Sequence, residues 1–377
     1  MRILVVGGGT GGTIVANHLA RRLADDIRGN KAHITLLSDT DKHMYQPGLL
    51  YVAFGQMSPD QLYRDEASML ESAVDFHVDP VTSFDFDHNE VETESGANYP
   101  YDILVIATGS RIEPEEVPGL NEAAYNFFTE ENALRMYKAL REFKGGTIAM
   151  TVSVPHKCPV SPIEAIFMLH DYFKERGIRD QVRLQYYYPI NKVHTTANVA
   201  KWAEPEFQKA GIEYETLFNL KEVDAENKIA FSEEGSEAPF DMLIAIPPHR
   251  GSQVADDNQM GDGGWIPTDR HKLTMEGYDN VYVIGDCTNV PVSKTGSAAH
   301  YEAEVVAENI TSIMRIGTPV TEYDGKVYCF IEAGFDRATY NAFDYYNLPD
   351  LKPPSKSLHR FKVAYNKMYW TTVRGLL

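Results

Sequence analysis

Cysteine is scarce in this sequence, with three residues in a chain of 377. A fold held together by disulfide bonds needs a much higher density of cysteine, so the count excludes a disulfide framework. Any cysteine pair that has a role here is therefore expected to be redox-active rather than architectural.

Long apolar runs and an excess of basic residues are also missing. No run approaches the roughly 20 apolar residues that cross a bilayer, and no charged leader or apolar signal segment precedes the first predicted strand at Arg2. Lysine and arginine total 35 against 54 acidic residues, a formal net charge of −19. Because nucleic-acid binding needs clustered cations, this balance argues against a nucleic-acid partner. The sequence predicts an intracellular protein.

The chain opens with a pattern of strand, glycine loop and helix. Residues 2–6 read as a short buried strand, a glycine-rich loop spans 7–12, and apolar residues follow at helical spacing over 14–23. Gly7 would allow the tight turn, Gly9 the approach of a pyrophosphate, and Gly12 close packing of helix on strand. A second strand, 33–37, ends at Ser38 and Asp39, where a ribose-binding side chain is expected. The pattern predicts a dinucleotide site.

Two later strands end in small-residue turns. The first, over 100–106, runs into Ala107-Thr108-Gly109, and the second, near 280–284, runs into Gly285-Asp286. The order and spacing of the three turns are similar to those of flavoproteins with two dinucleotide-binding domains. That resemblance implies FAD as the cofactor, with Asp286 on its ribityl chain.

Between these turns lies a second strand–helix–strand pattern, over 147–153, 162–176 and 182–188. Its first turn, residues 154–162, contains no glycine, so the backbone is not expected to approach a pyrophosphate, and use of NADH or NADPH is not predicted. Ser161 and Glu164 form a capping-box pattern around Pro162. Glu164 is predicted to be a structural cap, with proton transfer as the alternative.

Cys158 lies directly before the predicted helix. The helix amino terminus, with Lys157 and His156 alongside, is expected to lower the pKa of its thiol; the alternative is an inert buried thiol. Cys329 lies in a strand-like run, 327–334, that follows a predicted helix over 296–313. Cys287 is expected to pack near the flavin without taking part. The predicted redox pair is Cys158 and Cys329.

The ordered motifs resemble those of sulfide:quinone oxidoreductases and their relatives, the flavocytochrome c sulfide dehydrogenases, over roughly residues 1–335. The motifs are the glycine loop, Ala107-Thr108-Gly109, Lys157-Cys158-Pro159 with Pro162 and Glu164, residues 247–250, 264–266, Gly285-Asp286, Lys294-Thr295-Gly296 and residues 329–332. The resemblance implies that sulfide attacks a Cys158–Cys329 disulfide beside FAD, that two electrons enter FAD, and that zero-valent or polysulfide sulfur leaves. It also implies that Lys294 lies beside the flavin and the quinone, rather than being a solvated surface lysine.

Two departures from that family refine the expectation. Many members have a third cysteine where this chain has residues 125–128, and flavocytochrome c attaches its flavin covalently in the segment that corresponds to 43–50, which here lacks cysteine. Non-covalent FAD and a membrane quinone as electron acceptor are therefore expected. Four aromatic residues are candidates for stacking on the quinone, although core packing is the alternative: Phe330, Phe335, Tyr340 and Phe343.

The carboxyl-terminal segment reverses the charge of the chain. After Asp350 there are six basic residues and no acidic one, which leaves 29 basic and 54 acidic residues before it. Apolar and aromatic residues from Leu358 to Thr372 follow helical spacing, including Phe361, Tyr365, Met368 and Tyr369. A basic amphipathic helix suits a membrane surface, and a helix packed on the protein's own core is the alternative.

The predicted fold class is α/β with two interleaved Rossmann-like domains. The expected domains are a split FAD-binding domain, 1–113 and 270–318; a second domain without a nucleotide loop, 114–269; and a region for quinone and membrane docking, 319–377. The predicted activity is oxidation of sulfide by a membrane quinone through FAD. The predicted location is the cytoplasmic side of a membrane, and a homo-oligomer is one possible assembly. The alternatives are a type II NADH:quinone oxidoreductase and a non-catalytic flavoprotein subunit of a sulfur redox complex.

Overall fold

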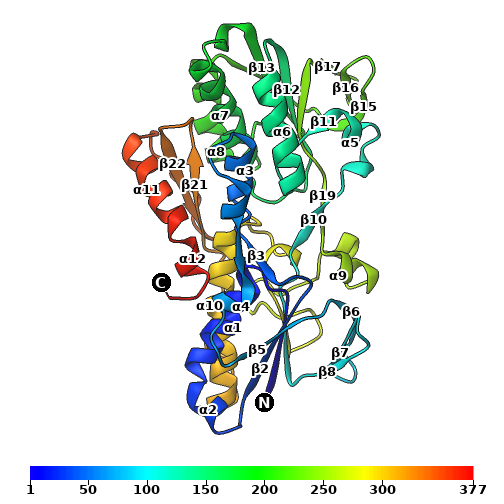
Figure 1. The fold of residues 1–377 in the computed structure, drawn as a ribbon, viewed down its shortest axis with the longest axis vertical. Helices are drawn as coiled ribbons and strands as arrows, with labels where there is room; N and C mark the ends of the chain where they lie inside the picture. Colours follow the sequence, from blue (N-terminus) through cyan, green and yellow to red (C-terminus); the bar gives the residue numbers. More distant parts are fainter. Residues whose placement is uncertain (377) are drawn as a thin grey trace.

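Two parallel β-sheets of five strands each form the centres of two lobes. The computed structural model describes residues 1–376, and Figure 1 shows the first sheet in the lower half of the molecule and the second in the upper half. The predicted class, α/β with two Rossmann-like units, is confirmed.

The first sheet has the order β20-β9-β1-β2-β5, and every pair in it is parallel. Its strands are β1 (Arg2–Val6), β2 (His33–Ser38), β5 (Val74–Val78), β9 (Ile103–Ile106) and β20 (Val281–Val283). Strand β9 is buried along its whole length, as expected for an apolar run covered on both faces. The sheet therefore joins the amino-terminal segment to a strand from much later in the chain.

The second sheet has the order β11-β18-β12-β13-β14 and is also parallel throughout. Its strands are β11 (Ala124–Tyr125), β12 (Gly146–Val152), β13 (Val182–Tyr188), β14 (Ile212–Thr216) and β18 (Met242–Ile246). Strand β13 has the predicted bounds, and β12 is displaced by one residue from the predicted 147–153.

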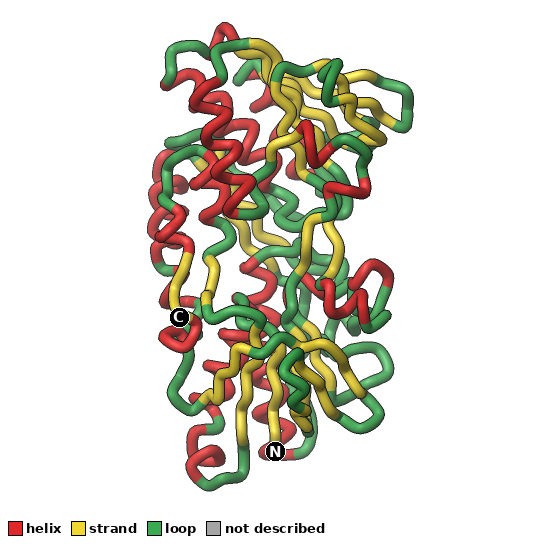
Figure 2. Tube along the Cα trace, turned by 45° about the vertical axis from the view of Figure 1, so that its right-hand side comes forward, coloured by secondary structure: helices red, strands yellow, loops and turns green. Residues whose placement is uncertain are grey.

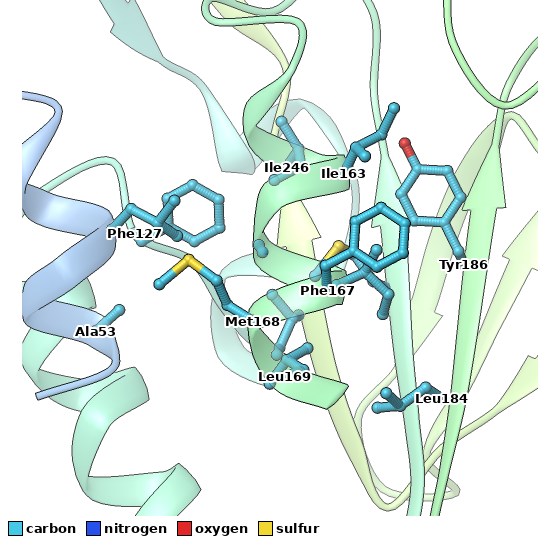
Figure 3. Close-up of a cluster of buried hydrophobic side chains, with 14 of the residues drawn as sticks. Ala53, Phe127, Ile163, Phe167, Met168, Leu169, Leu184, Tyr186 and Ile246 are labelled. Atoms are coloured by element: carbon cyan, nitrogen blue, oxygen red, sulfur yellow. The ribbon is translucent and has the colours of Figure 1, made fainter. Parts of the chain in front are cut away.

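Helices cover both sheets. The larger ones are α1 (Thr10–Arg22), α6 (Glu130–Glu142), α7 (Ser161–Glu175), α8 (Ala197–Lys209) and α10 (Gly296–Ile316), and the shorter ones are α2 (Ala24–Arg28), α3 (Gly48–Ala53), α4 (Glu66–Met69), α5 (Leu120–Ala123) and α9 (Gln253–Asp257). Helix α1 packs on α10 in the lower lobe. Figure 3 shows α7 between the second sheet and α3, with Phe167 toward Tyr186 and Met168 toward Phe127.

Short antiparallel strands complete the lobes and connect them (Figure 2). The pair β10 (Ser110–Ile112) and β19 (His249–Gly251) lies between the lobes in Figure 1. The other strands are β3 (Lys42–Met44) with β4 (Tyr63–Asp65), β6 (Val81–Asp85) with β7 (Glu90–Thr93) and β8 (Asn98–Pro100), and β15 (Leu220–Asp224) with β16 (Ile229–Ser232) and β17 (Glu237–Pro239).

The carboxyl-terminal part is a β-hairpin followed by two helices. Strands β21 (Val327–Glu332) and β22 (Ala338–Phe343) pair antiparallel, and α11 (Lys356–Lys367) packs on β22 and leads into α12 (Tyr369–Thr372). Strand β21 contacts both α7 of the upper lobe and α10 of the lower lobe. Among residues 1–376, no helix combines the length and the apolar character that crossing a membrane requires.

Candidate functional site

A cavity of about 290 Å³ lies where the two lobes and the carboxyl-terminal part meet. Its wall includes residues from the glycine loop, the turns after β9 and β20, the β12–α7 loop, β21 and the carboxyl-terminal helices. The predicted site residues in the wall are Gly9, Ala107, Gly109, Cys158, Glu164, Gly285, Asp286, Lys294, Thr295, Gly296, Cys329 and Phe330. Residues predicted from distant motifs are therefore brought together.

The glycine loop has the geometry that its sequence predicts. Gly7 has φ +108°, and a Cβ added there would lie 2.4 Å from the carbonyl oxygen of Ala107. A Cβ on Gly12 would lie 2.0 Å from the carbonyl oxygen of Gly7, so α1 approaches β1 closely. Gly9 has open space around it and lines the cavity. The loop thus leaves room for a ligand at the amino terminus of α1.

The other turns lie around the same space. Gly285 has φ +75°, and its N–H donates to a carboxylate oxygen of Glu302 at 2.6 Å, a contact that the sequence analysis did not predict. The hydroxyl of Thr295 accepts from the N–H of Ala298 and caps α10, whose first residue, Gly296, lines the cavity. Two helix amino termini and the carboxylate of Asp286 thus border one cavity.

These features fit FAD. An uncrowded glycine at a helix amino terminus suits a pyrophosphate, and Asp286 offers an acceptor for hydroxyl groups. Ser38 is buried at the end of β2, and a Cβ on Gly8 would lie 2.8 Å from its Oγ atom. Asp39 is exposed beside it. Neither Ser38 nor Asp39 lines the cavity. Thr108, another predicted site residue, does not line it either, and its hydroxyl donates to the hydroxyl of Ser252 at 2.7 Å.

The β12–α7 loop brings a cysteine into the cavity. Cys158 has φ +50°, an uncommon value for a residue with a side chain. Its N–H donates to the carbonyl oxygen of Lys294 at 2.8 Å, and its own carbonyl accepts from Ser161 at 2.9 Å. The first bond joins the loop before α7 to the loop before α10. The loop contains no glycine, as the sequence shows.

The predicted capping box at α7 is wrong. Val160 precedes the helix, and no side chain caps it. Instead, one carboxylate oxygen of Glu164 accepts from the N–H of Glu332 at 2.8 Å and from the ammonium of Lys362. Both partners come from the carboxyl-terminal part, which a local sequence pattern does not reveal.

Cys329 shares the cavity with Cys158, and its strand β21 packs against both α7 and α10. Both cysteines line the cavity and are free thiols. The prediction of a lowered pKa for Cys158 is wrong: burial, together with Glu164 and Cys329, raises the pKa of this thiol to about 12. Burial also raises the pKa of Cys329 to about 12. Burial lowers the pKa of His156 to about 4, so this neighbour is uncharged near neutral pH.

Cys287 and Lys294 have different surroundings. Cys287 is fully buried, with its Sγ atom 3.3 Å from the carbonyl oxygen of Ile284, and it does not line the cavity. Lys294 lines the cavity, donates to the carbonyl oxygen of Thr288 and lies over the ring of Trp265 at 4.7 Å. Burial lowers its pKa. Lys294 is therefore no solvated surface lysine.

A buried charge cluster that no sequence pattern indicated lies beside the cysteines. Lys362 of α11 pairs with Glu164, and its ammonium lies 3.7 Å from Glu332. Burial by itself would lower the pKa of Lys362, but Glu164, Tyr51 and Glu332 together raise it well above its usual value. Lys362 was expected to be one of the cations that face lipid. It is instead buried against the protein.

Half of the carboxyl-terminal segment packs on the protein. Tyr369 is buried, and its hydroxyl lies 2.7 Å from Nε2 of His43 and 2.9 Å from the hydroxyl of Thr10. By contrast, Phe361, Tyr365 and Met368 are exposed. The helical spacing was predicted correctly, but only part of the apolar surface is free.

One of the four predicted quinone-stacking residues, Phe330, lines the cavity. Phe335 packs edge-on against Phe54, and Tyr340 stacks on Tyr328. Phe343 lies at the far end of β22, opposite Val327. In the wall of the cavity, the structure adds Phe127, Phe128 and Tyr365, which the sequence analysis did not single out as quinone contacts.

Comparison with known proteins confirms the resemblance to sulfide:quinone oxidoreductases. The mitochondrial sulfide:quinone oxidoreductase of Mus musculus is 28% identical over 91% of this chain and 78% of its own length. A type II NADH:quinone oxidoreductase of Staphylococcus saprophyticus is 25% identical over 86% of this chain and 85% of its own length.

The fold has a counterpart among solved structures. The X-ray structure of the sulfide:quinone oxidoreductase from Aquifex aeolicus superposes with a TM-score of 0.84, at 24% identity, over 99% of this chain and 91% of that one. The pyridine nucleotide-disulphide oxidoreductase family matches residues 1–305. The chain therefore belongs to the pyridine nucleotide-disulphide oxidoreductase family.

Proposed function

We propose that this protein is an FAD-dependent sulfide:quinone oxidoreductase. The observation that carries the proposal is the meeting of Cys158 and Cys329 in one cavity with the glycine loop and Asp286. The curated relatives and the family assignment support both the activity and the cofactor. Non-covalent attachment is part of the proposal, because no cysteine lies in residues 43–50.

In the proposed reaction, sulfide attacks a disulfide between Cys158 and Cys329. A sulfur–sulfur bond to one cysteine forms, the disulfide bond breaks, and the other cysteine leaves as a thiolate that holds the electron pair. FAD, when bound, supplies a two-electron acceptor beside the pair. Once two electrons have left and zero-valent sulfur has been released, the disulfide is restored. Lys294 would hold a positive charge where negative charge collects.

In this proposal, the quinone and a membrane surface meet the protein at the carboxyl-terminal part of the cavity. Phe330 lies in the cavity wall, and the rings of Phe361 and Tyr365 lie 5.5 and 5.7 Å from its ring. These two outer residues are exposed, so an apolar quinone could pass from a lipid surface along them. Peripheral docking at the cytoplasmic side of a membrane, and the three expected domains, are part of this proposal.

The test is an anaerobic titration of the purified holoprotein, with flavin absorbance as the readout. We expect sulfide to bleach the flavin in the wild type and in Cys287→Ser, and we expect no bleaching in Cys158→Ser or Cys329→Ser. Full flavin reduction by sulfide in either of the last two variants would refute the proposed chemistry.

A parallel titration with NADH tests the alternative of a type II NADH:quinone oxidoreductase. The β12–α7 loop lacks glycine and carries two prolines, Pro155 and Pro159, so we expect NADH to leave the flavin oxidised. Bleaching by NADH and not by sulfide would favour the alternative. Turnover of sulfide and a short-chain quinone by the isolated protein would exclude a non-catalytic subunit.

A further inference from the structure

A line of four charged or titratable side chains leads from the cavity to the surface. Glu164 pairs with Lys362, and the Lys362 ammonium lies 3.7 Å from a carboxylate oxygen of Glu332. The second carboxylate oxygen of Glu332 lies 3.0 Å from Nδ1 of His359. Successive groups in the line lie within 3.7 Å of each other, and each can hold or pass a proton.

The inner end of this line opens into the cavity. Glu164 and Lys362 line it, as do Tyr51 and Asn366. The hydroxyl of Tyr51 donates to Glu332 at 3.1 Å, and the amide of Asn366 donates to that hydroxyl at 3.2 Å. Glu332 does not line the cavity but is bonded to groups that do. It therefore has two connections to the cavity, through Lys362 and through Tyr51.

The outer end is a histidine at the surface. The side chain of Glu332 is 1% exposed, whereas that of His359 is 22% exposed. The other charged groups near His359 are Lys356, which pairs with Asp336 at 2.7 Å, and Lys362. A partly exposed imidazole is in contact with water, whereas the buried carboxylate of Glu332 is not.

We propose that Glu332 and His359 form a proton entry route that serves the quinone end of the cavity. The inference rests on the proposed function. Oxidation of HS⁻ to zero-valent sulfur releases one proton and two electrons, and reduction of a quinone to the quinol takes up two electrons and two protons. Each turnover therefore draws one further proton from solvent. A bound quinone would fill the apolar side of the cavity, and the Glu332–His359 line passes beside that side.

The residues of this route act through other groups. His359 takes a proton from water and passes it to Glu332, and Tyr51 or the Glu164–Lys362 pair passes it to the cavity. Lys362 lies between the two carboxylates, so its positive charge compensates both of them inside the protein. Burial raises the pKa of Glu164, and the contact with Lys362 opposes that shift.

The test uses His359→Ala in the full-length holoprotein with sulfide and a short-chain quinone. We expect quinone turnover to fall by roughly tenfold or more, since a proton-transfer group is lost. Added imidazole should restore much of the rate, because the partly exposed position leaves room for a small base. A purely structural histidine would not respond to imidazole. The control is His88→Ala, which removes an exposed histidine paired with Asp85 at 2.8 Å.

Each outcome decides between the interpretations. Loss of turnover with rescue by imidazole supports the route, and a Glu332→Gln variant should then lose turnover without rescue. Wild-type turnover in His359→Ala, or a loss that imidazole does not reverse, would overturn it. If the wild type itself does not turn over sulfide and quinone, the proposed function is wrong. Failure of the proposed function is thereby distinguished from failure of the proton route, which shows only in the variants.

Discussion

Lys362 is buried between Glu164 of α7 and Glu332 of β21, and each carboxylate depends on it for compensation. Removing one partner from a buried ion pair leaves an uncompensated charge, which costs far more than losing a pair at the surface. The same helix offers a natural comparison, because Lys356 pairs with Asp336 while its side chain is 70% exposed.

We therefore expect Lys362→Met to lower the free energy of unfolding by about 3–5 kcal/mol. Lys356→Met should lower it by less than about 1 kcal/mol. Urea denaturation of the two variants and the wild type, under one buffer condition, measures both. Equal stability of the two variants would show that the Lys362 cluster is solvated and not a buried ion network.

The surroundings of a single residue could be predicted from the sequence where its contacts lie close to it in the chain. Gly7 takes the positive φ of the tight turn, Gly12 packs on Gly7 in the same loop and Gly9 is uncrowded, so spacing was enough to predict their geometry. Glu164 was misread because its partners lie 168 and 198 residues away in the chain. The pKa of Cys158 was misjudged for a related reason, since burial of the thiol outweighs the effect of the helix end.

At the scale of elements, α11 has two different sides. Lys362 points into the protein, while Phe361, Tyr365 and Met368 are exposed at positions that share one face of a helix. Helical spacing predicted the amphipathic character of the segment but not that its basic and aromatic residues are divided between core and surface. That division depends on how α11 packs on β22 and beside the cavity, and the spacing of residues within the segment carries no information about this packing.

We expect Phe361→Glu to reduce binding to vesicles that contain anionic lipid. Phe361 is 59% exposed, so the change removes an apolar contact and adds a charge that anionic lipid repels, without cutting into the core. Ile316→Glu, at the end of α10 and 66% exposed, is the matched control and should bind vesicles like the wild type. Co-sedimentation measures both. Undiminished binding of Phe361→Glu would place the membrane contact elsewhere.

At the scale of the whole molecule, the cavity is built from parts that lie far apart in the sequence. Cys158 belongs to the loop before α7, and Cys329 lies on a hairpin that follows α10. The two Rossmann-like units could be predicted from motif spacing, but the order of the strands within each sheet was not predicted. Sequence could not show how β21 lies between the lobes, because strand β21 pairs with β22 alone and carries no motif for its contacts with α7 and α10.

Because of this arrangement, oxidation of the cysteine pair is expected to change the stability of the whole protein. A bond between Cys158 and Cys329 would tie the second lobe to the carboxyl-terminal hairpin and close a very long loop. Closing such a loop stabilises a protein by up to about 5 kcal/mol, chiefly by restricting the unfolded chain. We expect the oxidised protein to unfold at higher denaturant concentration than the reduced one, with the difference absent in Cys329→Ser and retained in Cys287→Ser.

Peptide mapping without reductant should find Cys158 joined to Cys329. Because Cys287 is buried away from the cavity, a Cys158–Cys287 peptide instead would contradict this arrangement of the two lobes and the hairpin.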